Sequence, residues 1–353
     1  MGKRADFGSN WSDFVAKWCP DVTPSVPCDE GWRALGIIER LFPEHLDKVL
    51  ADGLKGIAFI APMIDFGITL EACENLVGFD RLLSRMKKGE EAAFSEAKFA
   101  ASLVKLGYNP ILEPQLREKC LDALITVGGE KVYFEIITPN TCDVMKTAYS
   151  EMQSLTQRIM KEYTGIDVNI KLLTDPNTSI SDSILTYLKT LSPSAENTHE
   201  MPDVALIKYS TFTPTALSFE HKQNDVELPE LFVAHFNRTE DGIRTRINVQ
   251  VSMTDERAQR LMSAEAVHFS NEEINILVMD ISRVPGGIRC WSPLIQRRFQ
   301  PNINRRFGAV VLLSSCIEAA GISWRCSVLQ NQYAYKKPPK CLLDNLVKLG
   351  RIP

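Results

Sequence analysis

Residues 121–137 read LDALITVGGEKVYFEII, two apolar segments on either side of a Gly-Gly pair. The two glycines can both adopt the positive φ angles of a two-residue hairpin turn. Closing the chain at this turn pairs Val127 with Glu130 and fixes the register of both strands. Counting outward from that pair, we expect Asp122 to lie opposite Glu135.

Two opposed carboxylates on paired strands require an explanation. Directly opposed residues have Cβ atoms about 4.5–5.5 Å apart, where like charges destabilise the pair. A divalent cation would reverse that effect, because Mg²⁺ is held by one or two carboxylates while waters and a substrate phosphate complete its octahedron. We favour this interpretation over a longer turn or a protonated acid. A four-residue loop would shift the register by two residues and still keep both acids on one face.

A third carboxylate lies on a predicted helix over residues 91–106. Its apolar stripe has helical spacing and consists of Ala92, Ala93, Phe99, Ala100, Leu103 and Leu106. Glu96 falls in the middle of this stripe. A core-facing carboxylate is costly unless something pairs with it. The sequence leaves two interpretations open: Glu96 is satisfied by a buried arginine or backbone donors, or it belongs to a site with the hairpin acids.

Composition indicates a globular protein with local rather than general charge effects. Of 353 residues, 44% are hydrophobic and 24% are charged, which is typical of a folded soluble chain. The net charge of −4 gives no general attraction to nucleic acid, so a basic surface would have to be local. The nine cysteines include no C-x-x-C pair, and no signal peptide or membrane-spanning run is recognised. We therefore expect a cytoplasmic protein.

The order of predicted elements gives an α/β fold in three regions. Residues 1–89 form a helical N-terminal region, and residues 176–353 form a C-terminal α/β region packed on the core or continuing its sheet. The core, residues 90–175, has the order α-β-β-β-α-β. Its elements are helices at 91–106 and 141–163 and strands at 111–116, 119–127, 131–137 and 167–174.

This arrangement of acids resembles the PD-(D/E)XK nuclease superfamily, which has the restriction-endonuclease-like fold. The similarity covers roughly residues 89–174. It implies that Asp122 and Glu135 hold Mg²⁺ or Mn²⁺, that the backbone carbonyl of Ile136 completes the shell, and that Glu96 holds water or a second ion. The implied activity is metal-dependent hydrolysis of phosphodiester bonds, in DNA rather than RNA.

The sequence departs from the family pattern at two places. The family's lysine corresponds to Ile137, and the proline before the first strand acid corresponds to Leu121. Isoleucine cannot polarise water or stabilise phosphorane charge. Lys131 is four residues from Glu135 along the strand, a distance of about 13 Å that is too far for this role, and Lys98 and Lys146 are predicted on solvated helix faces. A catalytically inactive nuclease-like module that binds nucleic acid or protein is therefore the alternative, and an α/β protein of unrelated chemistry is a third.

A basic segment supports a nucleic-acid partner. Residues 283–307 contain six arginines and no acid, beside Trp291 and Phe299. Arginines interleaved with aromatic residues suit phosphate contacts and base stacking. The alternative is an exposed helix with flanking loops, and a homodimer or protein partner also stays open. The predicted nucleic-acid contacts are Arg289, Arg297, Arg298, Arg305 and Arg306.

Overall fold

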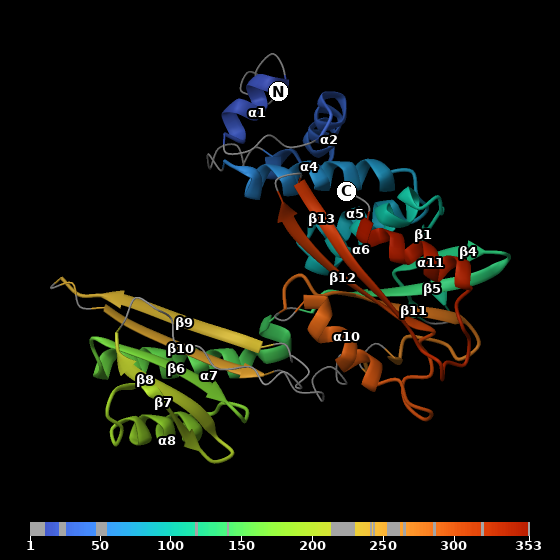
Figure 1. Cartoon of the computed structure of the whole chain (residues 1–353). Helices are drawn as coiled ribbons and strands as arrows, with labels where there is room; N and C mark the ends of the chain where they lie inside the picture. Colours follow the sequence, from blue (N-terminus) through green and yellow to red (C-terminus); the bar gives the residue numbers. More distant parts are fainter. Residues whose placement is uncertain are drawn as a thin grey trace. The chain divides into compact units, whose positions relative to one another are not determined.

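The chain forms two units, each with its own sheet (Figure 1). Unit 1 contains Met1–Thr138, Leu261–Ser282 and Ile295–Pro353, and unit 2 contains Pro139–Arg260 and Arg283–Leu294. Unit 1 is thus assembled from segments that precede and follow most of unit 2 in the chain. The computed structural model describes residues 11–20, 26–46, 55–116, 119–139, 141–212, 230–240, 242, 244–252, 262–263, 266–284, 287–318 and 321–351.

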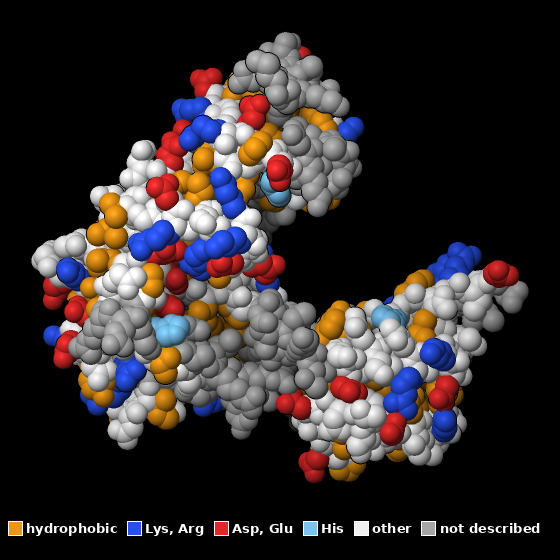
Figure 2. Space-filling view, turned by 180° about the vertical axis from the view of Figure 1, so that it is seen from behind, with side chains coloured by type: hydrophobic (Ala, Val, Ile, Leu, Met, Phe, Trp, Pro, Cys, Tyr) orange, Lys and Arg blue, Asp and Glu red, His pale blue; other side chains and the backbone are white. Residues whose placement is uncertain are grey.

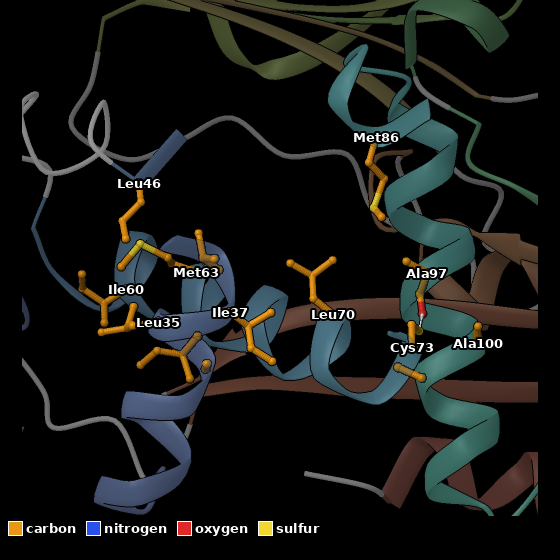
Figure 3. Packing of buried hydrophobic residues seen from close by; sticks show 14 of the residues in the cluster. Leu35, Ile37, Leu46, Ile60, Met63, Leu70, Cys73, Met86, Ala97 and Ala100 are labelled. Atoms are coloured by element: carbon orange, nitrogen blue, oxygen red, sulfur yellow. Dashed lines mark hydrogen bonds between the residues drawn. The ribbon is translucent and has the colours of Figure 1, made fainter. Parts of the chain in front are cut away.

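The predicted helical character of the N-terminal region is confirmed. Apolar side chains of α2 (Cys28–Leu41) and α4 (Ile57–Cys73), among them Leu35 and Met63, interdigitate (Figure 3). The Cys73 thiol at the end of α4 donates to the Ala97 carbonyl oxygen at 3.3 Å. A Cβ atom on Gly67 would lie 2.3 Å from the Ala34 carbonyl oxygen, so this close helix contact requires glycine. The helices are α1 (Trp11–Trp18), α2 (Cys28–Leu41), α4 (Ile57–Cys73), α5 (Phe79–Lys87) and α6 (Glu91–Lys105).

Unit 1 contains a six-stranded mixed sheet. Neighbouring strands are antiparallel except for the pairs β5–β11 and β11–β12, which are parallel. Helices α6 and α11 (Lys340–Val347) cover one face, and the rings of Phe99 and Phe134 pack 5.2 Å apart beneath α6. The spatial order is β1 (Ile111–Leu112), β4 (Ala123–Val127), β5 (Glu130–Ile137), β11 (Ile274–Asp280), β12 (Ala309–Glu318) and β13 (Gly321–Gln330).

The predicted hairpin register is confirmed from the pair Val127–Glu130 to the pair Ala123–Phe134, while the expected pair of Asp122 and Glu135 lies one step beyond the paired residues. Val127 pairs with Glu130, and Gly128 and Gly129 have φ angles of 60° and 88°. The strand before the turn is shorter than expected, because the 119–127 segment is interrupted before Ala123. Its first part instead forms β3 (Lys119–Cys120), which pairs with β2 (Gln115–Leu116).

Unit 2 contains a five-stranded mixed sheet. Helices α7 (Thr141–Glu162) and α8 (Thr178–Leu188) pack on one face, where Met152, Leu155 and Ile184 meet apolar strand residues. Neither α8 nor strand β7 (Ser194–Met201) was predicted. The spatial order is β7 (Ser194–Met201), β8 (Ala205–Thr211), β6 (Ile166–Leu172), β10 (Arg244–Ser252) and β9 (Glu230–Arg238).

The predicted core of residues 90–175 does not form one sheet. Strand β6 pairs with β8 and β10 in unit 2, whereas β5 pairs with β4 and with β11, which comes after most of unit 2 in the chain. The prediction failed because local hydrophobic patterning identifies a strand but not its partner. The expectation that C-terminal strands continue the core sheet holds for β11, β12 and β13. Among the described helices, none is long and apolar enough to cross a membrane.

Candidate acidic site at the start of strand β4

Asp122 lies just before β4, and its side chain takes part in the strand ladder. Its backbone N–H donates to the Phe134 carbonyl oxygen at 3.1 Å, whereas a regular continuation of the Ala123–Phe134 pair would turn this N–H away from β5. Its carboxylate Oδ2 accepts a hydrogen bond from the Ile136 N–H at 2.6 Å. The carboxylate therefore occupies the position where a longer β4 would have presented a backbone carbonyl to β5.

A fourth acid, which the sequence analysis did not identify, lies on the other side of Asp122. Leu112 pairs with Ala123, so the next residue, Glu113, is opposite Asp122 and donates its N–H to the Asp122 carbonyl oxygen at 3.0 Å. Glu113 has a φ angle of 49°, a left-handed conformation unusual for a side-chain-bearing residue, and its side chain is buried. Glu113, Asp122 and Glu135 thus form a row across three neighbouring strands.

The electrostatic environment of Asp122 is unfavourable to its ionised form. Burial raises the pKa of the Asp122 carboxyl well above its ordinary value, and the charges of Glu96 and Glu135 raise it further. The Ile136 N–H and the Arg85 guanidinium oppose this increase without cancelling it. The structure therefore brings all three predicted acids into electrostatic contact at one carboxyl group, Glu96 from helix α6 and Glu135 from strand β5.

Glu96 is paired with an arginine. Its side chain is 4% exposed, and Arg85 of α5 donates Nη1 to its Oε2 at 2.7 Å and Nη2 to its Oε1 at 2.8 Å. The same guanidinium contacts Glu90 Oε2 at 2.8 Å and Glu113 Oε1 at 3.2 Å, and Arg81 Nε lies 3.2 Å from Glu113 Oε2. Of the two interpretations left open for Glu96, pairing with an arginine is the one that the structure contains.

This ionic cluster holds more negative than positive charge. Burial lowers the pKa of Arg85, but hydrogen bonds to Glu96, Glu90 and Glu113 outweigh that effect and raise it. Burial raises the pKa of Glu96, and Arg85 offsets part of the increase. The Arg85 guanidinium is thus shared by three carboxylates, of which Glu113 also contacts Arg81, and among the described residues no cation forms an ion pair with Asp122.

Glu135 contacts a histidine from a distant segment. Residues 132, 134 and 136 of β5 face the core beneath α6, so Glu135 points to the opposite face of the sheet. There its Oε1 lies 2.7 Å from His268 Nδ1, in an interaction whose donor depends on the histidine tautomer. The Glu135 side chain is 10% exposed and that of His268 is 39% exposed. Solvent therefore reaches this pair mainly from the histidine side.

Few oxygen donors around Asp122 are left for a hard divalent cation. Within the described ranges, no group of three or more His, Cys, Asp and Glu side chains lies together in the manner of a metal site. Both carboxylate oxygens of Glu96 are engaged by Arg85. Asp122 and Glu135 remain, and the Ile136 carbonyl points to the same side of β5 as the N–H that binds Asp122. Mg²⁺ sites in proteins commonly use one or two carboxylates, with waters and substrate oxygens completing the shell, and Asp122 and Glu135 are the two acids that could supply them here.

The lysines considered as replacements do not reach the acids. Lys131 is exposed beside the hairpin turn, in register with Thr126. Lys98 forms an ion pair with Asp65 at 3.1 Å and lies 4.2 Å from the centre of the Trp324 ring, so it is not on a fully solvated face as expected. The Lys146 side chain lies outside the described residues. Neither Lys131 nor Lys98 therefore replaces the basic group that Ile137 lacks.

The predicted arginine surface is divided between the two units. Arg289 belongs to unit 2, while the other four arginines belong to unit 1. The helix alternative accounts for part of the segment, because α10 spans Gly287–Arg297. The expected stacking by neighbouring aromatic residues is wrong for this surface: Trp291 is 0% and Phe299 is 9% exposed, so both rings pack in the interior.

Three of the unit 1 arginines belong to loop structure. Arg305 Nε donates to the Tyr333 carbonyl oxygen at 3.1 Å. Arg306 donates Nε to Asn271 Oδ1 at 3.1 Å and Nη1 to the Ala266 carbonyl oxygen at 2.9 Å. The Arg298 carbonyl accepts a hydrogen bond from the Asn304 side chain. Arg297 is exposed at the end of α10.

Surface charge is mixed rather than uniform. One face of the molecule shows basic and acidic side chains next to one another, with hydrophobic side chains between them (Figure 2). This distribution agrees with the net charge of −4 and means that attraction to a polyanion must come from particular loops. Comparison with protein-family models, with curated proteins and with solved structures returned no match.

Proposed function

We propose that the protein is a Mg²⁺-dependent hydrolase of phosphodiester bonds in DNA, with its site at Asp122 and Glu135. The observation that carries this proposal is the crowding of negative charge at Asp122. Burial, Glu96 and Glu135 all raise the pKa of its carboxyl, which is the condition that a bound divalent cation relieves. A purely structural strand pair has no reason to oppose these two acids.

The topology of unit 1 supports a restriction-endonuclease-like core. Without the inserted unit 2, the chain order is helix α6, strands β1, β4 and β5, and then β11, which is parallel to β5. Two parallel neighbours need a crossover connection, and the chain supplies one that contains unit 2. The proposed fold is therefore a nuclease-like core with an insertion where the resemblance places the second helix.

Each residue of the site has a chemical part in this proposal. Asp122 and Glu135, with the Ile136 carbonyl, would hold the ion, which when bound supplies water activation and neutralises charge on the phosphate. His268 fixes the orientation of Glu135. Arg85 holds Glu96 and Glu113 in place beside Asp122.

The described cysteines are free thiols, which supports the proposed cytoplasmic location.

The test is cleavage of labelled single-stranded and duplex DNA with Mg²⁺, with Mn²⁺ and with EDTA. We expect cleavage only with a divalent ion, and a loss of about 100-fold or more for Asp122→Asn. Asp80→Asn is the matched control, because Asp80 is an exposed aspartate of the same unit. Cleavage that persists in EDTA, or in Asp122→Asn at the rate of the control, would contradict the proposal.

A second candidate is a nuclease-like module that binds nucleic acid without cutting it. The bidentate pairing of Glu96 with Arg85 and the isoleucine at position 137 favour it. It predicts DNA binding that is unchanged in Asp122→Asn and no cleavage under any divalent ion. Measuring binding and cleavage on the same preparations separates the two candidates.

A further inference from the structure

Two loops meet at one end of the six-stranded sheet of unit 1. The first, residues 298–308, leads into β12, and the second, residues 331–339, follows β13. Because β12 and β13 are antiparallel, the end of one adjoins the start of the other. The loops are joined directly: the Tyr335 N–H donates to the Arg305 carbonyl oxygen at 2.9 Å, and Arg305 Nε donates to the Tyr333 carbonyl oxygen at 3.1 Å.

Buried contacts fix the two loops against each other. Asn331 is fully buried, and its side-chain amide donates to the carbonyl oxygens of Asn304 and Phe307 at 2.9 and 3.0 Å. At Gly308, an added Cβ atom would lie 2.5 Å from Pro338 Cδ and 2.9 Å from the Lys336 carbonyl oxygen. The surface that these loops present is therefore set before any ligand arrives, which reduces the entropy lost on binding.

The surface carries one exposed aromatic ring among cations. Tyr335 is 47% exposed, and the guanidinium carbon of Arg305 lies 4.2 Å from the centre of its ring. Lys336, Lys337 and Lys340 are exposed directly after it. Between residues 283 and 343 the sequence contains one acid, Glu318. Other nearby acids are the exposed Asp344, four residues after Lys340 on α11, and Glu272 and Glu273, next to the Asn271 that binds Arg306.

We propose that this surface binds single-stranded nucleic acid, with one base stacked on Tyr335 and the flanking phosphates held by Lys336 and Lys337. The Arg305 guanidinium lies over one side of the Tyr335 ring and places a positive charge beside it, so the other side is the stacking face. A base offers a π face beside a phosphate, whereas an acidic peptide offers charge without a ring. The inference rests on the nucleic-acid partner of the proposed function and names the form of that partner.

Binding is measured by fluorescence anisotropy with a labelled single-stranded DNA 12-mer in EDTA, where metal-dependent cleavage is absent. Tyr335→Ala should weaken binding about tenfold, and Tyr335→Phe should leave it unchanged, because stacking depends on the ring. Lys336→Ala/Lys337→Ala should weaken binding and lower the salt slope by about 1.4, since each phosphate contact on a single strand contributes about 0.7. The matched control is Lys87→Ala/Lys88→Ala, an exposed lysine pair of the same unit.

Several results would overturn the inference. These are an unchanged affinity in Tyr335→Ala, an equal loss in both lysine pairs, tighter binding of duplex than of single strand, and displacement of the DNA by polyglutamate at equal charge. Thermal unfolding of each variant checks that the fold is retained. The binding assay is independent of catalysis. DNA binding without any cleavage would therefore contradict the proposed hydrolase alone. Cleavage by the wild type together with unchanged DNA affinity in the Tyr335 and Lys336/Lys337 variants would contradict this surface alone.

Discussion

The two sheets of the molecule treat a buried aspartate in opposite ways. In unit 2, Asp167 of β6 lies directly opposite Arg246 of β10, and the guanidinium binds its carboxylate through Nε and Nη2. In unit 1, Asp122 lies one residue beyond the pair of Ala123 and Phe134, which places it next to Glu135. A cross-strand pair of opposite charges is a structural element, whereas a pair of like charges stores a cost that a ligand can relieve.

The surroundings sharpen this contrast. Asp167 is fully buried beside one cation that faces it, so its charge is balanced locally. Asp122 shares the neighbourhood of Glu96, Glu113 and Glu135 with a guanidinium that is already bound to other acids. Strands β6 and β10 are parallel, whereas β4 and β5 are antiparallel and Asp122 precedes β4. In both sheets, the charge of the neighbouring residue decides whether the buried aspartate is balanced.

The largest expected effect is in unit 2. Arg246→Ala removes the cation that faces a fully buried carboxylate and should reduce the free energy of unfolding by about 3–5 kcal/mol. Arg244→Ala is the matched control, because Arg244 is an exposed arginine two residues earlier on the same strand. Urea unfolding followed by circular dichroism measures both variants. Equal stability of the two would mean that Asp167 does not depend on its partner, which would remove the contrast between the sheets.

A smaller effect is expected at Arg85. Arg85→Ala leaves Glu96 buried without its cation and should cost about 1–3 kcal/mol, since the guanidinium is 30% exposed and Glu96 can take up a proton. If the acids around Asp122 form an ion site, millimolar Mg²⁺ should recover more stability in this variant than in the wild type. Differential scanning calorimetry with Mg²⁺ and with EDTA tests this. An equal Mg²⁺ response in both proteins would argue against an ion at this cluster.

The smallest effect is a pH-dependent gain in stability for Asp122→Asn. Because the folded pKa of Asp122 is raised above the unfolded value of about 3.9, the unfolded state releases its proton first as pH rises. The wild type therefore loses stability between about pH 4 and the folded pKa, and the asparagine variant does not. Its melting temperature should exceed that of the wild type by a few degrees at pH 8. The difference should shrink toward pH 4, and a constant difference would contradict the raised pKa.

The hairpin was predictable because its determinants are local. Two adjacent glycines with positive φ fix the turn, and the turn fixes which residues of the two strands face each other. The helical stripe that contains Glu96 was predictable for the same reason. These two local patterns predicted that Glu96 faces the core and that Asp122 and Glu135 lie close together on the hairpin.

The remaining site residues come from contacts that no local pattern encodes. Arg85 lies on a separate helix, and His268 comes from a segment after the inserted unit. Glu113 was hidden in a segment predicted as one strand, whereas its positive φ breaks that strand between β1 and β2. The sheet to which β6 belongs also depends on long-range pairing, since its alternation of apolar residues would suit either sheet.

The insertion of unit 2 between β5 and β11 has a consequence for biosynthesis. Strand β5 leaves the ribosome with Val132, Phe134 and Ile136 ready for a core, but its hydrogen-bonding partner β11 follows only after nearly the whole of unit 2 has been translated. At about 5–20 residues per second, the nascent chain must keep this hydrophobic strand edge away from other chains for several seconds. Rapid folding of unit 2 on its own would shorten the tether between the two strands and so protect the half-built sheet from aggregation.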